Sequence, residues 1–268
     1  MRHRSTYAAS DGPAYQRFLG RWTAWLAPPF LAFARLPEKG PVLDVGCGTG
    51  SLSLALAARD PHRSVVGLDI AAPYIAFAQA QVRTERVRFT IGDACALPLG
   101  NGAFAGSLAQ LALNFVPDAG KAVGEMRRVT RPGGVVAACV WDFRGGLVYQ
   151  RLFWDTAAGI DDGAGAARDR LFSHELSVPD GLPRLWEKAG LRDVLRDSLT
   201  IRMDYAGFAD YWQPLLGGQG PFGSYVSGLA PSLRDRIEAA VRRAYLSGAA
   251  DGPRSMTATA WAVRGVVP

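Results

Sequence analysis

Three aspartates and a glycine-rich turn are spaced in a way that predicts a single polar binding site. Asp44 lies inside the first short apolar run of the chain, and three glycines alternate directly after it at Gly46, Gly48 and Gly50. Asp69 and Asp93 end the next two apolar runs. If these runs are neighbouring parallel strands, their carboxyl ends open into the same crevice.

The three carboxylates suit a nucleoside that carries a positive charge. A carboxylate inside a strand, such as Asp44, is costly to bury without a cationic or hydrogen-bonding partner. Asp69 is placed to accept both hydroxyls of a ribose, and Asp93 to accept the exocyclic amine of an adenine between Ile70 and Leu97. A single aspartate of this kind more often caps a helix or turn. Three at successive strand ends favour binding.

The spacing of the glycines separates two classes of nucleotide site. Glycine tolerates the positive φ angles of a tight turn and lets the backbone approach a ligand closely. Enzymes that bind dinucleotides use G-x-G-x-x-G, whereas this turn reads G-x-G-x-G and continues with Ser51. The spacing therefore disfavours a nicotinamide cofactor.

Alternation of strands and helices is expected to position these residues. β-branched apolar runs predict strands at 41–45, 64–69, 87–92, 104–110 and 134–141, and the intervening segments 51–58, 73–83 and 118–130 have helical composition. Further patterns predict helices at 14–26, 178–191 and 232–246 and strands at 192–202 and 255–267. Glycine-rich or polar composition predicts a loop at 159–167, a turn at 131–134 and a hinge or turn at 217–221.

The stretch from Val42 to Trp141 resembles the class I S-adenosylmethionine-dependent methyltransferases, in particular the ubiquinone/menaquinone-biosynthesis-like (type 11) branch. Beyond the glycine turn, the likeness includes Gly92-Asp93-Ala94 with Leu97-Pro98, the segments 107–118 and 125–134, and a leading helix at 15–22. The resemblance implies an α/β, Rossmann-like class I methyltransferase fold, with a seven-stranded, mostly parallel sheet, helices on both faces and a helical lid.

The same resemblance implies how the chain divides and which residues hold the cofactor. One methyltransferase domain would span 1–268, with an N-terminal helical segment (1–36), a cofactor-binding core (37–142), a continuation with lid inserts (143–230) and a last helix and strand (231–268). Gly46 to Gly50 would face the methionine part, Asp69 the ribose, Asp93-Ala94 the adenine, and Gln110-Leu111 the sulfonium. The expected cofactor-binding residues are Tyr15, Arg21, Asp44, Gly46, Cys47, Gly48, Thr49, Gly50, Asp69, Ile70, Asp93, Ala94, Gln110 and Leu111.

The implied reaction is methyl transfer from S-adenosylmethionine to a small-molecule acceptor by in-line displacement, giving S-adenosylhomocysteine. A sulfonium is a good leaving group, so positioning the acceptor supplies most of the catalysis, and no metal is expected. A hydroxyl acceptor would benefit from a general base, for which His174 and Asp142 are weak candidates, because a solvated loop histidine and a turn or helix cap are the more ordinary interpretations of the two. Aromatic residues in 143–175 and 204–230 suit an apolar or aromatic acceptor.

Composition narrows the remaining choices. The 268 residues carry a net charge of +6, but the basic residues do not form a run, so a nucleic-acid partner is not expected. No stretch reaches the about 18 apolar residues of a membrane span, and no signal peptide is apparent, which favours a cytoplasmic protein. The three cysteines lack the close spacing of zinc or redox motifs.

Three alternatives stay open at this point. A tRNA or rRNA methyltransferase shares the fold, but Gln110-Leu111-Ala112-Leu113 replaces the Asn/Asp-Pro-Pro-aromatic motif that resembles amine-directed base methylation. A protein that binds S-adenosylmethionine without catalysis, and a nicotinamide-dependent oxidoreductase, are the others. The sequence leaves open which atom of the acceptor (O, N, C or S) is methylated, and also the oligomeric state.

Overall fold

The structure, a computed structural model, describes residues 11–268 and is built on one seven-stranded sheet. The strand order is β3-β2-β1-β4-β5-β7-β6, with β7 antiparallel to both of its neighbours and the other strands parallel. The strands are β1 (Val42–Val45), β2 (Val65–Asp69), β3 (Val87–Ile91), β4 (Phe104–Gln110), β5 (Thr130–Trp141), β6 (Arg192–Tyr205) and β7 (Arg254–Val266). The predicted α/β fold with a mostly parallel sheet is confirmed.

Helices fill the connections between the strands. The α-helices are α1 (Gly12–Tyr15), α2 (Arg21–Ala34), α3 (Ser51–Arg59), α4 (Ala72–Gln81), α5 (Ala119–Val129), α6 (Val148–Ala158), α7 (Asp162–Phe172), α8 (Gly181–Lys188), α9 (Phe208–Trp212), α10 (Gly220–Ser227) and α11 (Pro231–Leu246). A π-helical turn, η1 (Gln16–Gly20), joins α1 to α2, and short 3-10 turns are η2 (Leu113–Phe115), η3 (Glu175–Ser177) and η4 (Gln213–Gly217).

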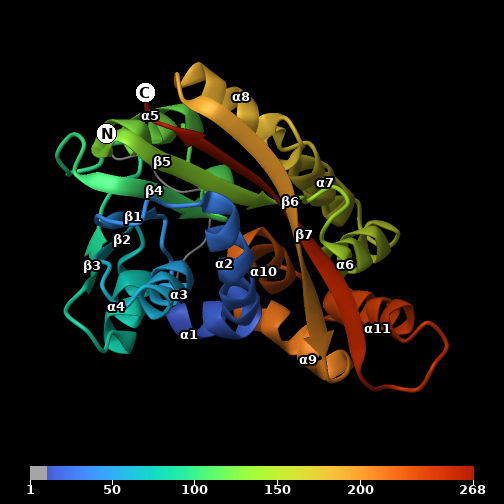
Figure 1. Cartoon of the computed structure of the whole chain (residues 1–268). Helices are drawn as coiled ribbons and strands as arrows, with labels where there is room; N and C mark the ends of the chain where they lie inside the picture. Colours follow the sequence, from blue (N-terminus) through green and yellow to red (C-terminus); the bar gives the residue numbers. More distant parts are fainter. Residues whose placement is uncertain (1–10) are drawn as a thin grey trace.

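Both faces of the sheet are buried, because the strands send alternate side chains to two separate apolar clusters. Val42 belongs to the cluster under α2 and α3, whereas Leu43 and Val45 belong to the cluster under α5 and α8. A parallel strand covered on both faces reads as a continuous apolar run, as 42–45 does. Figure 1 shows the helices on the two sides of the sheet.

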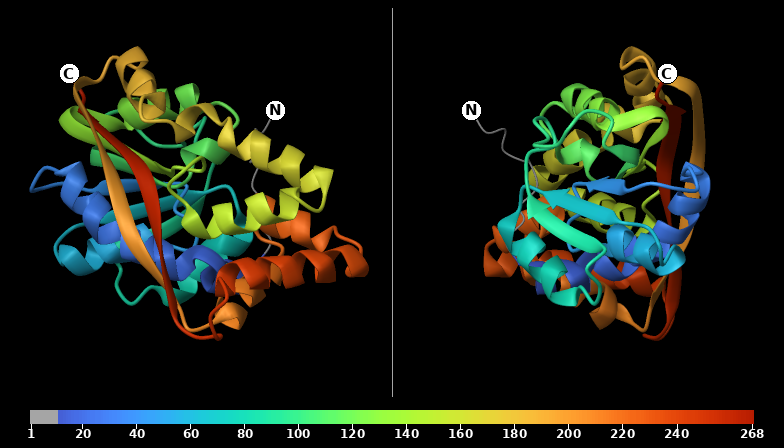
Figure 2. Two further views of the ribbon diagram at one scale, coloured as in Figure 1. Left: turned by 90° about the vertical axis from the view of Figure 1, so that its right-hand side faces the viewer. Right: turned by 60° about the vertical axis from the view of Figure 1, so that its left-hand side comes forward.

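The antiparallel pair β6 and β7 extends beyond the parallel strands. At this end lie helices outside the alternating core, α6, α7, α9, α10 and α11, which we call the added helices (Figure 1). Both strands run past the end of β5 toward α9 and α11 (Figure 1). Two further views show α6, α7 and α11 together at this end of the molecule (Figure 2). The helices α6 to α7 and α9 to α10 fall within the two inserts that we predicted to form a lid.

The leading segment is helical as predicted, and it continues further than the aromatic pattern indicated. Helix α2 runs to Ala34 through Pro28 and Pro29, and Leu26 and Phe30 are fully buried against the sheet. Tertiary burial thus outweighs the cost of proline inside the helix. Residues 1–10 of the predicted N-terminal segment lie outside the described residues.

Two of the predicted connections were wrong. The small-residue stretch 159–167 is not a loop throughout, because α7 begins at Asp162, after the Asp161 side chain accepts the Ala164 N–H at 2.9 Å. Burial of Ala164 against the core then stabilises the helix. The predicted turn at 131–134 is the irregular start of β5, where the pairing with β4 shifts register and Gly133 takes φ +73°.

The topology opens a crevice beside β1. Strand β1 pairs with β2 on one side and β4 on the other, so the chain moves away from β1 in both directions. At such a switch point the carboxyl ends of the strands leave room for a ligand. Within 11–268, no helix is long and apolar enough to span a membrane.

We expect a hydrogen bond between α8 and β5 to contribute to folding stability. The Trp186 indole is fully buried, and its Nε1 donates to the Val136 carbonyl at 2.9 Å. Trp186→Phe leaves that carbonyl without this donor and should lower the free energy of unfolding by about 1–3 kcal/mol. Urea unfolding measures the effect. Trp25→Phe, at a side chain that is 62% exposed, is the control and should change it by less than about 0.5 kcal/mol; equal effects would contradict the assignment.

Candidate functional site

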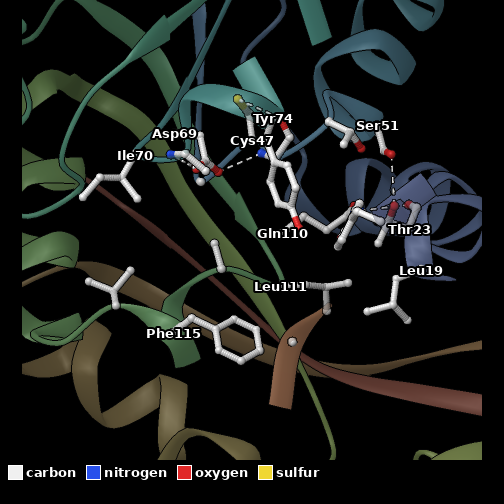
Figure 3. Close-up of a pocket in the computed structure, with 18 of the residues that line it drawn as sticks. Leu19, Thr23, Cys47, Ser51, Asp69, Ile70, Tyr74, Gln110, Leu111 and Phe115 are labelled. Atoms are coloured by element: carbon white, nitrogen blue, oxygen red, sulfur yellow. Dashed lines mark hydrogen bonds between the residues drawn. The ribbon is translucent and has the colours of Figure 1, made fainter. Parts of the chain in front are cut away.

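A pocket occupies the crevice at the carboxyl ends of β1, β2 and β4. Residues from the glycine turn, from the strand ends and from the added helices line it. Figure 3 shows Leu19, Leu111 and Phe115 on one side of this space, across from Asp69 and Ser51. The pocket therefore has a polar side and an apolar side.

The glycine turn has the backbone that the spacing predicted. Gly46, Gly48 and Gly50 have φ of +69°, +53° and +90°, a region that other residues rarely adopt. A Cβ on Gly46 would lie 2.3 Å from the Cβ of Ala112, so this position needs glycine for space as well. The Gly46 and Cys47 N–H groups both donate to the Leu68 carbonyl, at 2.7 and 3.1 Å, which fixes the turn against β2.

Asp44 is a buried carboxylate with one free oxygen. It is 1% exposed, and its Oδ2 accepts the Ser53 hydroxyl at 2.6 Å, while Oδ1 has no partner. Burial raises the pKa of Asp44 to about 7, with Ser53 opposing this shift. An unpaired buried carboxylate oxygen in the pocket wall fits a cationic or amine-bearing ligand.

Asp69 holds the turn and faces the pocket at the same time. Its Oδ2 accepts the Gly48 N–H at 2.9 Å, and its Oδ1 accepts the Ala71 N–H at 2.8 Å. Burial raises its pKa, and these backbone donors oppose the shift. A carboxylate offers about four lone pairs, so both oxygens retain capacity for the hydroxyls of a bound ribose.

Asp93 and its neighbours form the outer end of the pocket. The Asp93 Oδ1 accepts the Cys95 N–H at 2.8 Å, and Asp93, Ala94 and Ile70 all line the pocket. Leu97 does not. It is buried in the cluster under α5, so the expectation that it forms an apolar wall beside Ile70 was wrong.

Gln110 and Leu111 end β4 inside the pocket. The Gln110 Nε2 donates to the Thr23 carbonyl of α2 at 2.9 Å, and its buried Oε1 has no partner. Leu111 takes φ +61°, an uncommon conformation for a leucine, and its N–H donates to the Cys139 carbonyl at 2.8 Å. Strain of this kind costs about 1–3 kcal/mol and is concentrated at functional sites.

The remaining predicted cofactor residues divide into two groups. Tyr15, Cys47 and Thr49 line the pocket, and burial keeps the Cys47 thiol protonated by raising its pKa. Arg21 is not among the lining residues: its guanidinium pairs with Asp210 at 2.9 Å and lies over the Trp22 ring, 4.2 Å from its centroid. The structure therefore does not bring Arg21 into the site.

Neither candidate base lies in the pocket wall. The His174 Nδ1 accepts the Leu176 N–H at 3.2 Å, which caps η3. The Asp142 Oδ1 accepts the Arg144 and Gly145 N–H groups, both at 3.0 Å, in the turn after β5. Asp142 therefore caps a turn, and His174 caps η3. Because both lie outside the pocket lining, the structure does not support a proton-transfer role for either.

Several lining residues escaped the sequence reasoning because their positions depend on tertiary contacts. Tyr74 of α4 lines the pocket, and its hydroxyl donates to the Gln219 Oε1 at 2.9 Å, linking α4 to the turn before α10. Thr23, Trp141 and Gln150 line it from α2, β5 and α6. Of these residues, only Trp141 could have been predicted from the sequence, because it ends a predicted strand.

The apolar side of the pocket, which we call the distal wall, comes from η2, the end of β5 and the added helices. It comprises Phe115, Val116, Pro117, Trp141, Phe143, Gln150, Leu171, Gly220, Pro221 and Phe222. None of these side chains ionises. A buried charge on a ligand would find no partner there.

The charge of the pocket is opposite to that of the chain. The chain carries +6, yet among residues 11–268 the pocket is lined by Asp44, Asp69 and Asp93 and by no lysine, arginine or histidine. Such a lining favours a cation and opposes a pyrophosphate or a nucleic-acid backbone. In the described part of the chain, no cluster of histidine, cysteine and acidic residues could hold a metal ion.

Comparison with known proteins assigns this region to a family. Residues 42–134 match a family described as a methyltransferase domain. This match spans the glycine turn, Asp69 and Asp93. Residues 42–134 are thus similar to a methyltransferase domain.

A relative supports the same assignment over a limited length. The demethylmenaquinone methyltransferase of Thermus thermophilus is 42% identical over 106 residues, which are 39% of this chain and 47% of that protein. The chain spans about half the length of the curated relatives that it matches.

Solved structures share the fold over more of the chain. A putative methyltransferase from Bacillus halodurans C-125 superposes with a TM-score of 0.56 at 16% identity, covering 90% of this chain and 98% of that one. The [4+2]-cyclase SpnF superposes with a TM-score of 0.53 at 23% identity, covering 100% of this chain and 88% of that one. These similarities concern the fold.

The buried Asp44 of the methyltransferase domain should make folding stability depend on pH. Its pKa is raised from 3.8 to about 7, so the folded state holds a proton that the unfolded state has released. Its effect on the free energy of unfolding is most favourable below about pH 4 and declines as pH rises toward 7, by at most about 1.4 kcal/mol per pH unit.

Chemical denaturation of the wild type and of Asp44→Asn between these pH values measures this decline. Asp44→Asn should lack the decline in the free energy of unfolding that Asp44 causes. Asp235→Asn, at an exposed site on α11, should keep that decline. If the free energy of unfolding changed with pH in the same way in all three proteins, a raised pKa at Asp44 would be contradicted.

Proposed function

We propose that this protein transfers the methyl group of S-adenosylmethionine to a small apolar or aromatic acceptor and releases S-adenosylhomocysteine. The observation that carries the proposal is the charge of the pocket, where three carboxylates meet no basic side chain among residues 11–268. A sulfonium nucleoside complements this lining. The match of residues 42–134 to a methyltransferase domain and the similarity to the demethylmenaquinone methyltransferase of Thermus thermophilus support the same interpretation.

The residues present fit this cofactor. The free Oδ1 of Asp44 and the free Oε1 of Gln110 are acceptors that suit its cationic methionine end. Asp69 would hold the ribose, and Asp93 with Ala94 would hold the adenine beside Ile70. The glycine turn lets its backbone lie against the ligand without a Cβ in the way.

The chain's own part in the reaction is positioning. S-adenosylmethionine, when bound, supplies an electrophilic methyl group on a good leaving group. The distal wall keeps water out and orients the acceptor, and well-oriented groups can lower a barrier by about 7–11 kcal/mol. Because no distal-wall side chain ionises and neither His174 nor Asp142 lines the pocket, the acceptor must be nucleophilic without a base from this wall.

Other readings are supported less well. An acidic pocket argues against both a nicotinamide dinucleotide and a tRNA or rRNA substrate, because phosphates would be repelled. The fold by itself does not set the reaction, since the [4+2]-cyclase SpnF shares it. A protein that binds the cofactor without methyl transfer is therefore the alternative that turnover has to test.

Asp69→Ala should weaken binding of S-adenosylmethionine by about 1.5–3 kcal/mol, because it removes hydrogen bonds to a charged acceptor. It also frees the Gly48 N–H, which loosens the turn. Titration calorimetry measures the affinity, and Asp235→Ala is the control at an exposed carboxylate on α11. Unchanged affinity in a folded Asp69→Ala protein would sink the ribose assignment.

Turnover is the second test. The purified protein, supplied with S-adenosylmethionine and a panel of phenolic, quinol, thiol and amine acceptors, should release S-adenosylhomocysteine with at least one uncharged acceptor, as measured by mass spectrometry. Asp69→Ala should lower the rate at subsaturating cofactor. Binding of NAD without binding of S-adenosylmethionine would overturn the proposal, and binding without turnover would favour the non-catalytic alternative.

A further inference from the structure

The distal wall contains two buried polar atoms that no protein group satisfies. Gln150 is 6% exposed and Trp141 is 3% exposed, and both line the pocket. The Gln150 Oε1 and the Trp141 Nε1 have no hydrogen-bond partner. Buried polar groups in native proteins are nearly always paired, so two orphans in one pocket wall call for a ligand that pairs with them.

Local contacts hold the Gln150 amide in place. Its Nε2 donates to the Tyr149 hydroxyl at 3.0 Å, and the Tyr149 carbonyl in turn accepts the Tyr211 hydroxyl at 2.8 Å. All three residues are buried, in the first turn of α6 and in α9. With one end of the amide engaged in this way, Oε1 is left as a fixed hydrogen-bond acceptor.

Trp141 supplies the complementary donor. It is the last residue of β5, and an indole Nε1 can only donate. Trp186, also fully buried, satisfies its own Nε1 on the Val136 carbonyl. Trp154, Trp212 and Trp261 leave theirs unpaired as well, but they do not line the pocket. Trp141 is thus distinguished by its place in the same pocket wall as Gln150.

We propose that Gln150 and Trp141 select an uncharged acceptor that bears a hydroxyl group. The hydroxyl would donate to the Gln150 Oε1, and the same oxygen or a neighbouring oxygen of the molecule would accept from the Trp141 Nε1. Apolar atoms would contact Phe115, Phe143 and Phe222. Carboxylate, phosphate and ammonium acceptors are rejected, because a charge buried against this wall would be unpaired.

This inference rests on the proposed function, since it concerns the acceptor side of the same pocket. Its test uses binding and not turnover. The full-length protein, saturated with S-adenosylhomocysteine, is titrated by calorimetry or intrinsic fluorescence with β-naphthol, naphthalene and β-naphthoate. The wild type should bind β-naphthol more tightly than naphthalene and β-naphthoate least.

Gln150→Met keeps the length of the side chain and removes its amide. It should weaken β-naphthol binding roughly tenfold, the effect of losing one neutral hydrogen bond, and change naphthalene binding less than about twofold. Trp141→Phe should act in the same direction. Gln213→Met, at an exposed glutamine of η4, is the matched control and should change neither affinity.

The outcomes separate the two proposals. Equal affinity of the wild type for β-naphthol and naphthalene, including no binding of either, overturns the recognition by Gln150 and Trp141. An equal loss for both probes in Gln150→Met also overturns it, because that result indicates a packing role. Retained binding of S-adenosylhomocysteine shows that the variant is folded. Failure of the wild type to bind S-adenosylhomocysteine, with the probe selectivity intact, would contradict the proposed function and leave the hydroxyl recognition standing.

Discussion

The pocket of this protein is arranged around one buried carboxylate in the first strand. Asp44 is 1% exposed, shares only one of its oxygens with Ser53 and leaves the other without a partner. Burying such a group costs free energy, and the fold tolerates the cost at the switch point of the sheet. The glycine turn, Asp69 and the end of β4 are arranged around the same point, so they share one pocket with it.

The pocket wall has two parts with different chemistry and different origins. Residues 42–134, which match a methyltransferase domain, supply the acidic part. Its three carboxylates and its glycine turn suit a cationic nucleoside. The distal wall comes mainly from segments after residue 134, with three members, Phe115, Val116 and Pro117, inside the matched region, and none of its side chains ionises. The family match falls on the first of these parts, at residues 42–134.

Specific contacts hold the added helices against α4 and against one another. The Tyr74 hydroxyl of α4 meets Gln219 before α10, and the Tyr225 hydroxyl of α10 donates to Asp161 at 2.7 Å ahead of α7. Gly218 and Gly220, with φ of +69° and +64°, allow the sharp turn between η4 and α10. These contacts place Phe222 over the pocket, where it completes the apolar side.

The sequence by itself determined the strands, the glycine turn and the three aspartates, because these depend on local pattern: apolar runs of strand length, positive φ angles and polar residues at strand ends. It predicted a loop where α7 begins at Asp162, and it counted Arg21 among the cofactor residues although Arg21 does not line the pocket. Only the tertiary structure could show the Arg21 pair with Asp210, which joins residues far apart in the chain, and the burial of Gln150, which depends on the packing around it. Packing also decides which aromatic residues line the distal wall. The sequence does not show this, because an aromatic side chain is equally suited to the core and to a pocket wall.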